Sequence, residues 1–221
     1  MNKDNVIGIV ATIKEKPRLI IDAQDWRLRV YETKIERLRP GKDKSDTFIL
    51  RYNGKAAGSE EALEIINEGV EVLIGGEVRS KNVKNPTAEE NKVIIYIFAE
   101  VIAVNDPPAD QQNEVYLCGR ICKTPRVRLK RCRIFGKKEI TITDIIVAVN
   151  GRSGANYIPC ACWDTQAKVA AELKIGTYVE IIGRLQSHTF IKRIVGRETP
   201  FLCINYGVNV CELGYEAQEG E

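Results

Sequence analysis

The chain has 221 residues, of which 44% are apolar and 29% are charged, as in ordinary globular proteins. This length gives room for two domains of about 100 residues each. No apolar run approaches the roughly 18 residues of a membrane-spanning helix, and Met1 leads into Asn-Lys-Asp, so we expect a cytoplasmic protein with no membrane partner.

The net charge of +3 conceals a difference between the two halves of the chain. Residues 1–110 have 17 Lys/Arg and 19 Asp/Glu, whereas residues 111–221 have 16 Lys/Arg and 11 Asp/Glu. An anionic partner would therefore prefer the second half.

The first half predicts five strand regions and one short helix. Apolar residues that alternate with polar ones, bounded by Pro, Gly and polar turns, indicate strands. Ser59 is a suitable N-cap for a helix that Gly69 ends. The expected strand regions are Asn5–Lys14, Leu19–Ile21 with Trp26–Leu38, Phe48–Tyr52, Val70–Ser80 and Lys92–Asn105.

The same pattern follows again after a proline-containing linker. Residues 106–112 have two prolines and a polar run, which cannot continue a strand. Residues 214–221 are predicted to form a flexible tail. The elements expected in the second half are strands Val115–Cys122 continued by Val127–Ile134, Glu139–Val149, Tyr157–Trp163, Tyr178–Gln186 and Phe201–Leu213, with a loop at Asn150–Asn156 and a helix at Gln166–Leu173.

An internal repeat supports the division into two similar units. Residues 61–80 align without a gap with residues 168–187, and this alignment matches Gly69, Gly76 and Ser80 with Gly176, Gly183 and Ser187. Gly8 is matched with Gly119, because the spacings to Gly76 and Gly183 are similar, 68 and 64 residues. One short helix between strands is typical of an OB-fold, a five-stranded Greek-key barrel. We therefore predict an all-β protein with one short helix per domain and two tandem OB-folds, residues 1–105 and 113–213.

Residues for catalysis are sparse in this sequence. The only histidine, His188, lies near Phe190 in a basic segment without a nucleophile motif. The chain has neither a Walker loop nor a pattern of paired carboxylates. We therefore predict that the protein is not an enzyme and needs no cofactor.

The seven cysteines indicate buried, reduced thiols. Their number is odd and no secretion signal is present. Cys118-x3-Cys122 and Cys160-x-Cys162 resemble halves of a zinc site, but the C-x2-C knuckle is absent. Strand alternation puts Cys160 and Cys162 on the same face as Ile158, where small thiols would fill a core. We therefore predict no metal site.

A basic segment in the second half is the strongest functional signal. Residues 123–138 have eight Lys/Arg and no acidic residue. A solvated hairpin would explain an isolated charge run, but this one falls where the first two strands of an OB-fold approach its binding face. Basic residues that follow phosphates, together with aromatic rings that stack on bases, bind single strands without reading sequence.

The aromatic residues of the second half are interleaved with these bases. Alternation turns Tyr157 and Trp163 away from the cysteines, although a lone Trp in a strand is as often a core residue. The candidate binding residues are Arg126, Arg128, Lys130, Arg131, Arg133, Phe135, Arg152, Tyr157, Trp163, Arg184, Phe190 and Lys192.

The first half has poorer equivalents of these residues. Val83 stands where Phe190 stands, and Tyr52 is the nearest match to Trp163. We therefore predict a degenerate N-terminal domain and a C-terminal domain that does most of the binding.

Motifs in order along residues 113–190 resemble the bacterial single-stranded-DNA-binding protein family. The motifs are NEVYLCGRI (113–121), PRVR (125–128), IVAVN (146–150), YIPCACW (157–163), LKIG (173–176) and VEIIGRL (179–185). The resemblance implies an OB-fold that binds single-stranded DNA and oligomerises. It also implies stacking roles for Tyr157, Trp163 and Phe190, and backbone-binding roles for residues 126–133 and Arg184.

Two departures from the family pattern affect the expected partners. The long linker and the acidic, Phe-ended C-terminal peptide are not found, which puts recruitment of replication or recombination proteins in doubt. The two units per chain imply a tandem variant, in which a homodimer would supply the family's four units.

The sequence therefore predicts sequence-independent binding of single-stranded DNA in replication, recombination or repair, in a bacterium or phage. A rival from another class is an OB-fold adaptor of a replisome or primosome with weak DNA affinity. A rival within the nucleic-acid class is single-stranded RNA, since no feature of the sequence tests for a 2′-hydroxyl.

Overall fold

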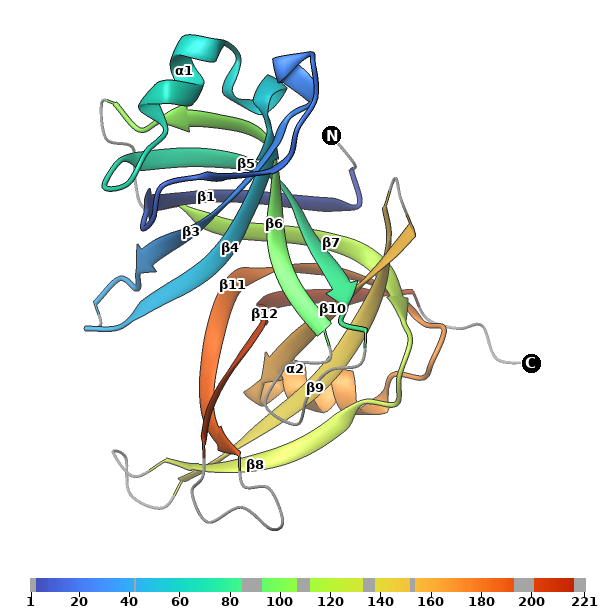
Figure 1. Ribbon diagram of the computed structural model, residues 1–221. Coiled ribbons are helices and arrows are strands. Elements are labelled where there is room, and N and C mark those ends of the chain that lie inside the picture. Colours follow the sequence, from blue (N-terminus) through green and yellow to red (C-terminus); the bar gives the residue numbers. More distant parts are fainter. Residues whose placement is uncertain are drawn as a thin grey trace.

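The computed structural model shows two β-barrels joined through a continuous sheet of twelve strands (Figure 1). The described residues are 3–41, 43–84, 93–106, 112–132, 138–151, 154–192 and 201–216. None of the helices within these ranges is long and apolar enough to span a membrane.

The N-terminal barrel is closed by one parallel and several antiparallel pairings. The first strand pairs with the third and the fifth, and the fourth pairs in parallel with the sixth. Ser59 caps the helix as expected, because its side chain accepts a hydrogen bond from the Ala62 N–H. The elements are β1 (Asn5–Ile13), β2 (Arg18–Ile21), η1 (Trp26–Leu28), β3 (Val30–Leu38), β4 (Ser45–Asn53), η2 (Gly54–Ala57), α1 (Glu60–Ile65), β5 (Glu71–Asn82) and β6 (Val93–Val104).

The C-terminal barrel has the same connectivity. Its first strand pairs with β9 and β11, and β10 pairs in parallel with β12. The predicted pair of tandem OB-folds, with one short α-helix each, is confirmed. The elements are β7 (Asn113–Ile121), β8 (Arg126–Cys132), β9 (Lys138–Gly151), β10 (Gly154–Trp163), α2 (Asp164–Glu172), β11 (Tyr178–Lys192) and β12 (Phe201–Tyr215).

Some predicted boundaries were wrong. Trp26–Leu28 is a 3-10 turn and not part of a strand, because the Asp25 carboxylate accepts a hydrogen bond from the Arg27 N–H and turns the chain. Residues 150–151 and 154–156 of the predicted loop instead belong to β9 and β10, where Gly151 pairs with Gly154. β11 continues to Lys192, and β12 includes Tyr215 of the predicted tail. Residues 217–221 of that tail lie outside the described residues.

The glycines of the repeat have the same roles in both barrels. Gly69 and Gly176 have φ values of +85° and +91°, the left-handed region that favours glycine, just before β5 and β11. Gly76 and Gly183 lie at bulges, where a Cβ would collide with the carbonyl oxygens of the facing strands β6 and β12. The alignment of residues 61–80 with 168–187 is therefore confirmed.

The match of Gly8 with Gly119 was wrong. The ladders pair Val72 with Ala11 and its counterpart Val179 with Gly119, so the N-terminal equivalent of Gly119 is Ala11. Gly8 instead pairs with Gly75.

A buried asparagine begins both barrels and is a better marker of the repeat. Asn5 donates to the Val78 carbonyl at 2.7 Å and accepts from the Val78 N–H at 3.0 Å. Asn113 makes the same two bonds with Leu185, at 2.9 and 3.1 Å. Each amide satisfies a buried peptide group just beyond the bulge, where the ladder pairing has ended.

The barrels are related by an approximate two-fold axis through the ladder between β1 and β7. Ile7 pairs with its own counterpart, Val115. Two further contacts across the junction are also equivalent. Asp46 accepts from the Ser187 N–H at 2.7 Å, and Asn156 accepts from the Ser80 N–H at 2.9 Å. The junction therefore resembles the interface of a symmetric dimer built within one chain.

Candidate functional site

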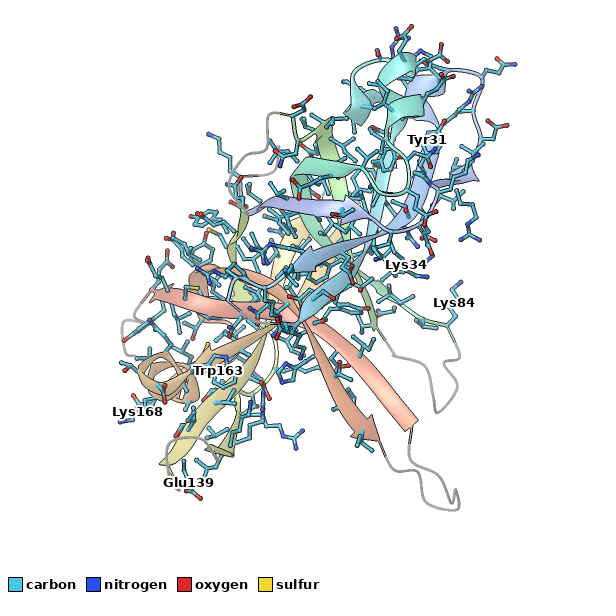
Figure 2. The ribbon with its side chains drawn as sticks, turned by 90° about the vertical axis from the view of Figure 1, so that its left-hand side faces the viewer. Tyr31, Lys34, Lys84, Glu139, Trp163 and Lys168 are labelled. Atoms are coloured by element: carbon cyan, nitrogen blue, oxygen red, sulfur yellow. The ribbon has the colours of Figure 1, made fainter. Side chains whose placement is uncertain are left out.

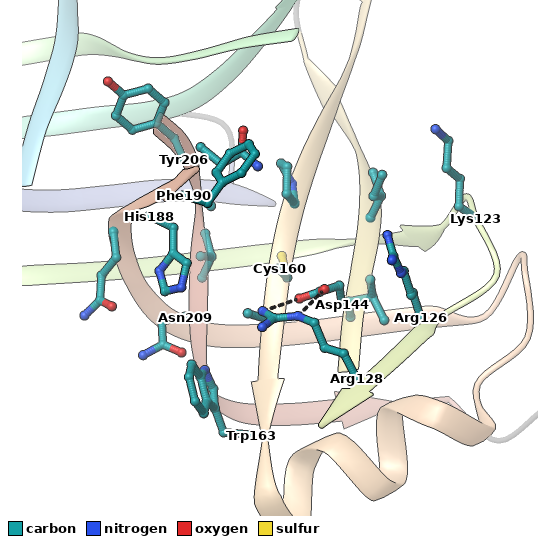
Figure 3. Close-up of a pocket in the computed structure, with 18 of the residues that line it drawn as sticks. Lys123, Arg126, Arg128, Asp144, Cys160, Trp163, His188, Phe190, Tyr206 and Asn209 are labelled. Carbon is teal, nitrogen blue, oxygen red and sulfur yellow. Dashed lines mark hydrogen bonds and ion pairs between the residues drawn. The ribbon is translucent and has the colours of Figure 1, made fainter. Parts of the chain in front are cut away.

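A groove of about 680 Å³ crosses the C-terminal barrel over β8 to β12 (Figure 3). Trp163 lies at one end, and Phe190 and Tyr206 lie at the other. Basic, polar and apolar residues together make up the walls and floor. The lining residues are Lys123, Thr124, Arg126, Arg128, Asp144, Ile145, Ile146, Pro159, Cys160, Ala161, Trp163, Gln186, His188, Phe190, Asn205, Tyr206, Gly207, Val208 and Asn209.

The alternation of buried and more exposed side chains along β10 is as predicted. Ile158, Cys160 and Cys162 are buried, whereas Tyr157 is exposed and Trp163 is half-buried on the opposite face. Burial raises the pKa of the Cys160 thiol well above its usual value, as expected for a core thiol. Among the described residues, no group of three or more His, Cys, Asp or Glu could hold a metal ion.

Trp163 lies beneath a cation at its end of the groove. The Lys130 Nζ is 5.3 Å from the centre of the indole ring. The Trp163 Nε1 and the Asn209 Oδ1 are both enclosed, and neither has a hydrogen-bond partner within the described part of the chain. This end of the groove therefore keeps unused hydrogen-bonding capacity beside an aromatic face.

An ion pair lies on the basic wall of the groove. Arg128 donates two hydrogen bonds to the Asp144 carboxylate, at 2.7 and 3.0 Å (Figure 3). His188 faces this wall, and burial together with the charges of Lys130 and Arg128 lowers its pKa. Burial and these cations therefore favour a neutral imidazole.

The structure brings together four of the predicted binding residues. Arg126, Arg128, Trp163 and Phe190 all line the groove, and Lys130 adjoins it through Trp163.

The remaining predicted residues lie elsewhere or are not described. Tyr157 is on the groove side of β10 but beyond its end, where its N–H donates to Ser80 of the other barrel at 2.8 Å. Arg184 is exposed on β11 and does not line the groove. Arg133, Phe135 and Arg152 lie outside the described residues, as do the side chains of Arg131 and Lys192.

Sequence reasoning missed the contribution of β12. Tyr206 and Asn209 line the groove, and Gly207 lies between them on its floor. A Cβ at Gly207 would lie 2.7 Å from the Pro159 carbonyl oxygen, so only glycine fits there. The sequence did contain one signal for this part of the groove, an aromatic residue followed by a glycine at Tyr206-Gly207.

The corresponding face of the N-terminal barrel is filled by its own side chains. The ladders make Arg51 and Tyr96 the counterparts of Ala161 and Gly207. The Arg51 guanidinium lies 4.5 Å from the centre of the Tyr96 ring and donates to Glu32 at 2.7 Å. This cation and this aromatic ring occupy the position of the groove floor.

A second pair fills the same face further along. The Arg79 guanidinium lies 3.9 Å from the centre of the Phe98 ring and pairs with the buried Glu77 at 3.0 Å. Charges and aromatic faces that are open in the C-terminal barrel are therefore used internally in the N-terminal barrel.

The predicted match of Tyr52 with Trp163 was wrong. Tyr52 occupies the position of Cys162 in the ladders and is buried, while Asn53 is the counterpart of Trp163. Tyr31 stacks on Tyr52 with ring centres 5.4 Å apart. This pair lies in the N-terminal barrel, whereas Trp163 lies in the C-terminal barrel (Figure 2).

Comparisons with known proteins agree with this fold. Residues 112–200 match the model of the single-strand binding protein family. The crystal structure of the wild-type single-stranded DNA binding protein from Thermus aquaticus is similar with a TM-score of 0.71 and 17% identity, covering 98% of this chain and 95% of that one. A deletion mutant of the same protein gives a TM-score of 0.70 and 17% identity, with 98% and 96% coverage. At this identity the likeness concerns the fold. A search of curated proteins finds no match.

Proposed function

Because residues 112–200 match the model of the single-strand binding protein family, we propose that this protein binds single-stranded DNA without reading its sequence. The groove is the main binding site. Trp163 and Phe190 stack on bases, and Arg126, Arg128 and Lys130 bind the backbone.

The observation that carries this proposal is the difference between the two barrels. The same fold occurs twice, and among the described residues the C-terminal copy presents an aromatic residue at each end of an open groove with a basic wall. In the N-terminal copy the equivalent floor positions hold Arg51 and Tyr96, which pair with each other and with Glu32. The N-terminal barrel has the same fold with this face filled, so the fold itself does not require an open groove.

A titration of the full chain with oligo-dT tests the proposal. A Trp26→Phe background leaves Trp163 as the only tryptophan, so stacking should quench its fluorescence directly. The logarithm of the binding constant should fall linearly with the logarithm of salt concentration, with a slope of about −0.7 per phosphate contacted. Tight binding that ignores salt and leaves Trp163 unquenched would contradict the proposal. Parallel titrations with oligo-rU and duplex DNA identify the preferred nucleic acid.

In replication, recombination or repair, the protein would cover and protect exposed single strands.

We also infer a homodimer, which would present four OB units. Sedimentation equilibrium should then give twice the chain mass of 24.8 kDa. A mass of one chain at micromolar concentration would contradict this assembly.

A further inference from the structure

The hairpin between β3 and β4 of the N-terminal barrel lies against the groove wall of the C-terminal barrel. The buried Asp46 accepts hydrogen bonds from both the N–H and the hydroxyl of Ser187, each at 2.7 Å. Arg39 donates to Asp46 at 2.8 Å and to the Ser187 carbonyl at 2.7 Å. The residues on either side of Ser187, Gln186 and His188, line the groove. The hairpin is therefore held beside the groove by buried contacts.

A second contact joins the same hairpin to the end of the groove. The Phe48 ring of β4 lies 6.0 Å from the ring of Tyr206, which lines the groove beside Phe190 (Figure 3). A strand of nucleotides that leaves the groove past these two aromatic residues therefore meets the N-terminal barrel.

The cations at this junction differ in how they are neutralised. Arg39 is paired with Asp46, and Lys34, on the side of its barrel that faces the junction (Figure 2), is paired with Glu15 at 3.1 Å. Lys44 is exposed at the end of the hairpin and makes no ion pair within the described part of the chain. It lies close enough to His188 for its charge to lower the pKa of that imidazole, after the larger effects of burial, Lys130 and Arg128.

Lys44 and Lys130 are two cations beside the groove that make no ion pair with any described residue. Lys130 lies over Trp163 at one end, and the hairpin that carries Lys44 contacts Tyr206 at the other end through Phe48. A polyanion in the groove would have one such cation at each end.

We propose that the β3–β4 hairpin is a second contact site for the single strand, in which Lys44 binds a backbone phosphate of nucleotides that leave the groove past Phe190 and Tyr206. This inference rests on the proposed function of the groove. It gives the N-terminal barrel a part in binding although its own face is filled.

Full-length Lys44→Gln and Lys44→Glu variants, titrated with dT oligomers of increasing length, test the contact. The lengths should run from about 4 to about 40 nucleotides, which extends well past the 4–16 nucleotides of a single OB-fold. Short oligomers confined to the groove should bind the variants as they bind the wild type. Longer oligomers should bind several-fold more weakly, Glu more than Gln, and the salt slope should shrink by about 0.7 to 1.

The control variant is Lys55→Gln. Lys55 is also exposed, but it lies on η2 beside α1, at the end of the N-terminal barrel remote from the C-terminal barrel (Figure 1). The Lys55→Gln variant should bind oligomers of every length as tightly as the wild type does. An equal loss of affinity in the Lys44→Gln and Lys55→Gln variants would mean a general charge effect and would overturn the contact.

The outcomes separate this inference from the proposed function. Wild-type binding that Trp163→Ala weakens, together with Lys44 variants that equal the wild type at every length, overturns the hairpin contact alone. Failure of the wild type to bind any dT oligomer overturns both.

Discussion

Replacing Trp163 by Ala should weaken binding of single-stranded DNA by roughly 5- to 150-fold, the equivalent of about 1–3 kcal/mol for one stacked base. The indole is half-buried at one end of the groove and is flanked by Lys130, so its removal takes away a stacking face and leaves that cation without its ring. Phe190→Ala removes the aromatic face at the other end and should cost a similar amount. Anisotropy of a labelled dT oligomer reports these affinities without using the protein's tryptophans.

Two further variants distinguish stacking from loss of structure. Trp163→Phe keeps an aromatic face and should recover much of the lost affinity. Trp26→Phe changes the other tryptophan, in the barrel whose face is filled, and should bind as the wild type does. If Trp163→Ala keeps full affinity, or if Trp26→Phe loses as much, the groove is not the binding site.

Replacing Asp46 by Ala should destabilise the protein by about 3–5 kcal/mol, because it leaves the Arg39 guanidinium without its carboxylate and the Ser187 N–H without an acceptor in a buried junction. Burial alone would raise the pKa of Asp46, but hydrogen bonds from Arg39 and Ser187 outweigh it, so the pKa lies below its usual value. The carboxylate therefore stabilises the fold fully above the unfolded-state pKa of about 3.9. This contribution is lost as the pH falls through the lower folded-state pKa.

The matched control is Asn156→Ala, at the position related to Asp46 by the approximate two-fold axis. Asn156 is neutral and accepts one hydrogen bond, from Ser80, so its loss should cost only about 1–3 kcal/mol. Urea unfolding at pH 7 and again below pH 4 measures both variants. A pH-independent deficit in Asp46→Ala, or one no larger than that of Asn156→Ala, would contradict the assigned role of the ion pair.

The parts of the fold that could be predicted are those that a single residue type enforces. Gly69 and Gly176 need a left-handed backbone, and Gly76 and Gly183 need space beside a facing carbonyl, so the repeat is visible in the sequence. The burial of Cys160 and Cys162 opposite Trp163 follows from the two-residue period of a strand.

The errors arose where the answer depends on register. Tyr52 and Asn53 are adjacent, but a shift of one residue along a strand moves a side chain to the opposite face, so the nearest aromatic residue was the wrong counterpart of Trp163. The filled face of the N-terminal barrel was likewise invisible. Arg51 and Tyr96 meet only because β4 pairs in parallel with β6, and the sequence does not specify that register.

The approximate two-fold axis through β1 and β7 has a consequence for how the two barrels diverged. In a dimer of identical chains, any substitution that fills one groove also fills its mate, so both sites are kept or lost together. Here the two mates lie on one chain and can change separately. The small residues Ala161 and Gly207 leave one groove open, while Arg51 and Tyr96 fill the corresponding face of the other barrel. Because both barrels lie on one chain, a substitution in one barrel leaves the other unchanged. The ladder between β1 and β7 that joins them is kept.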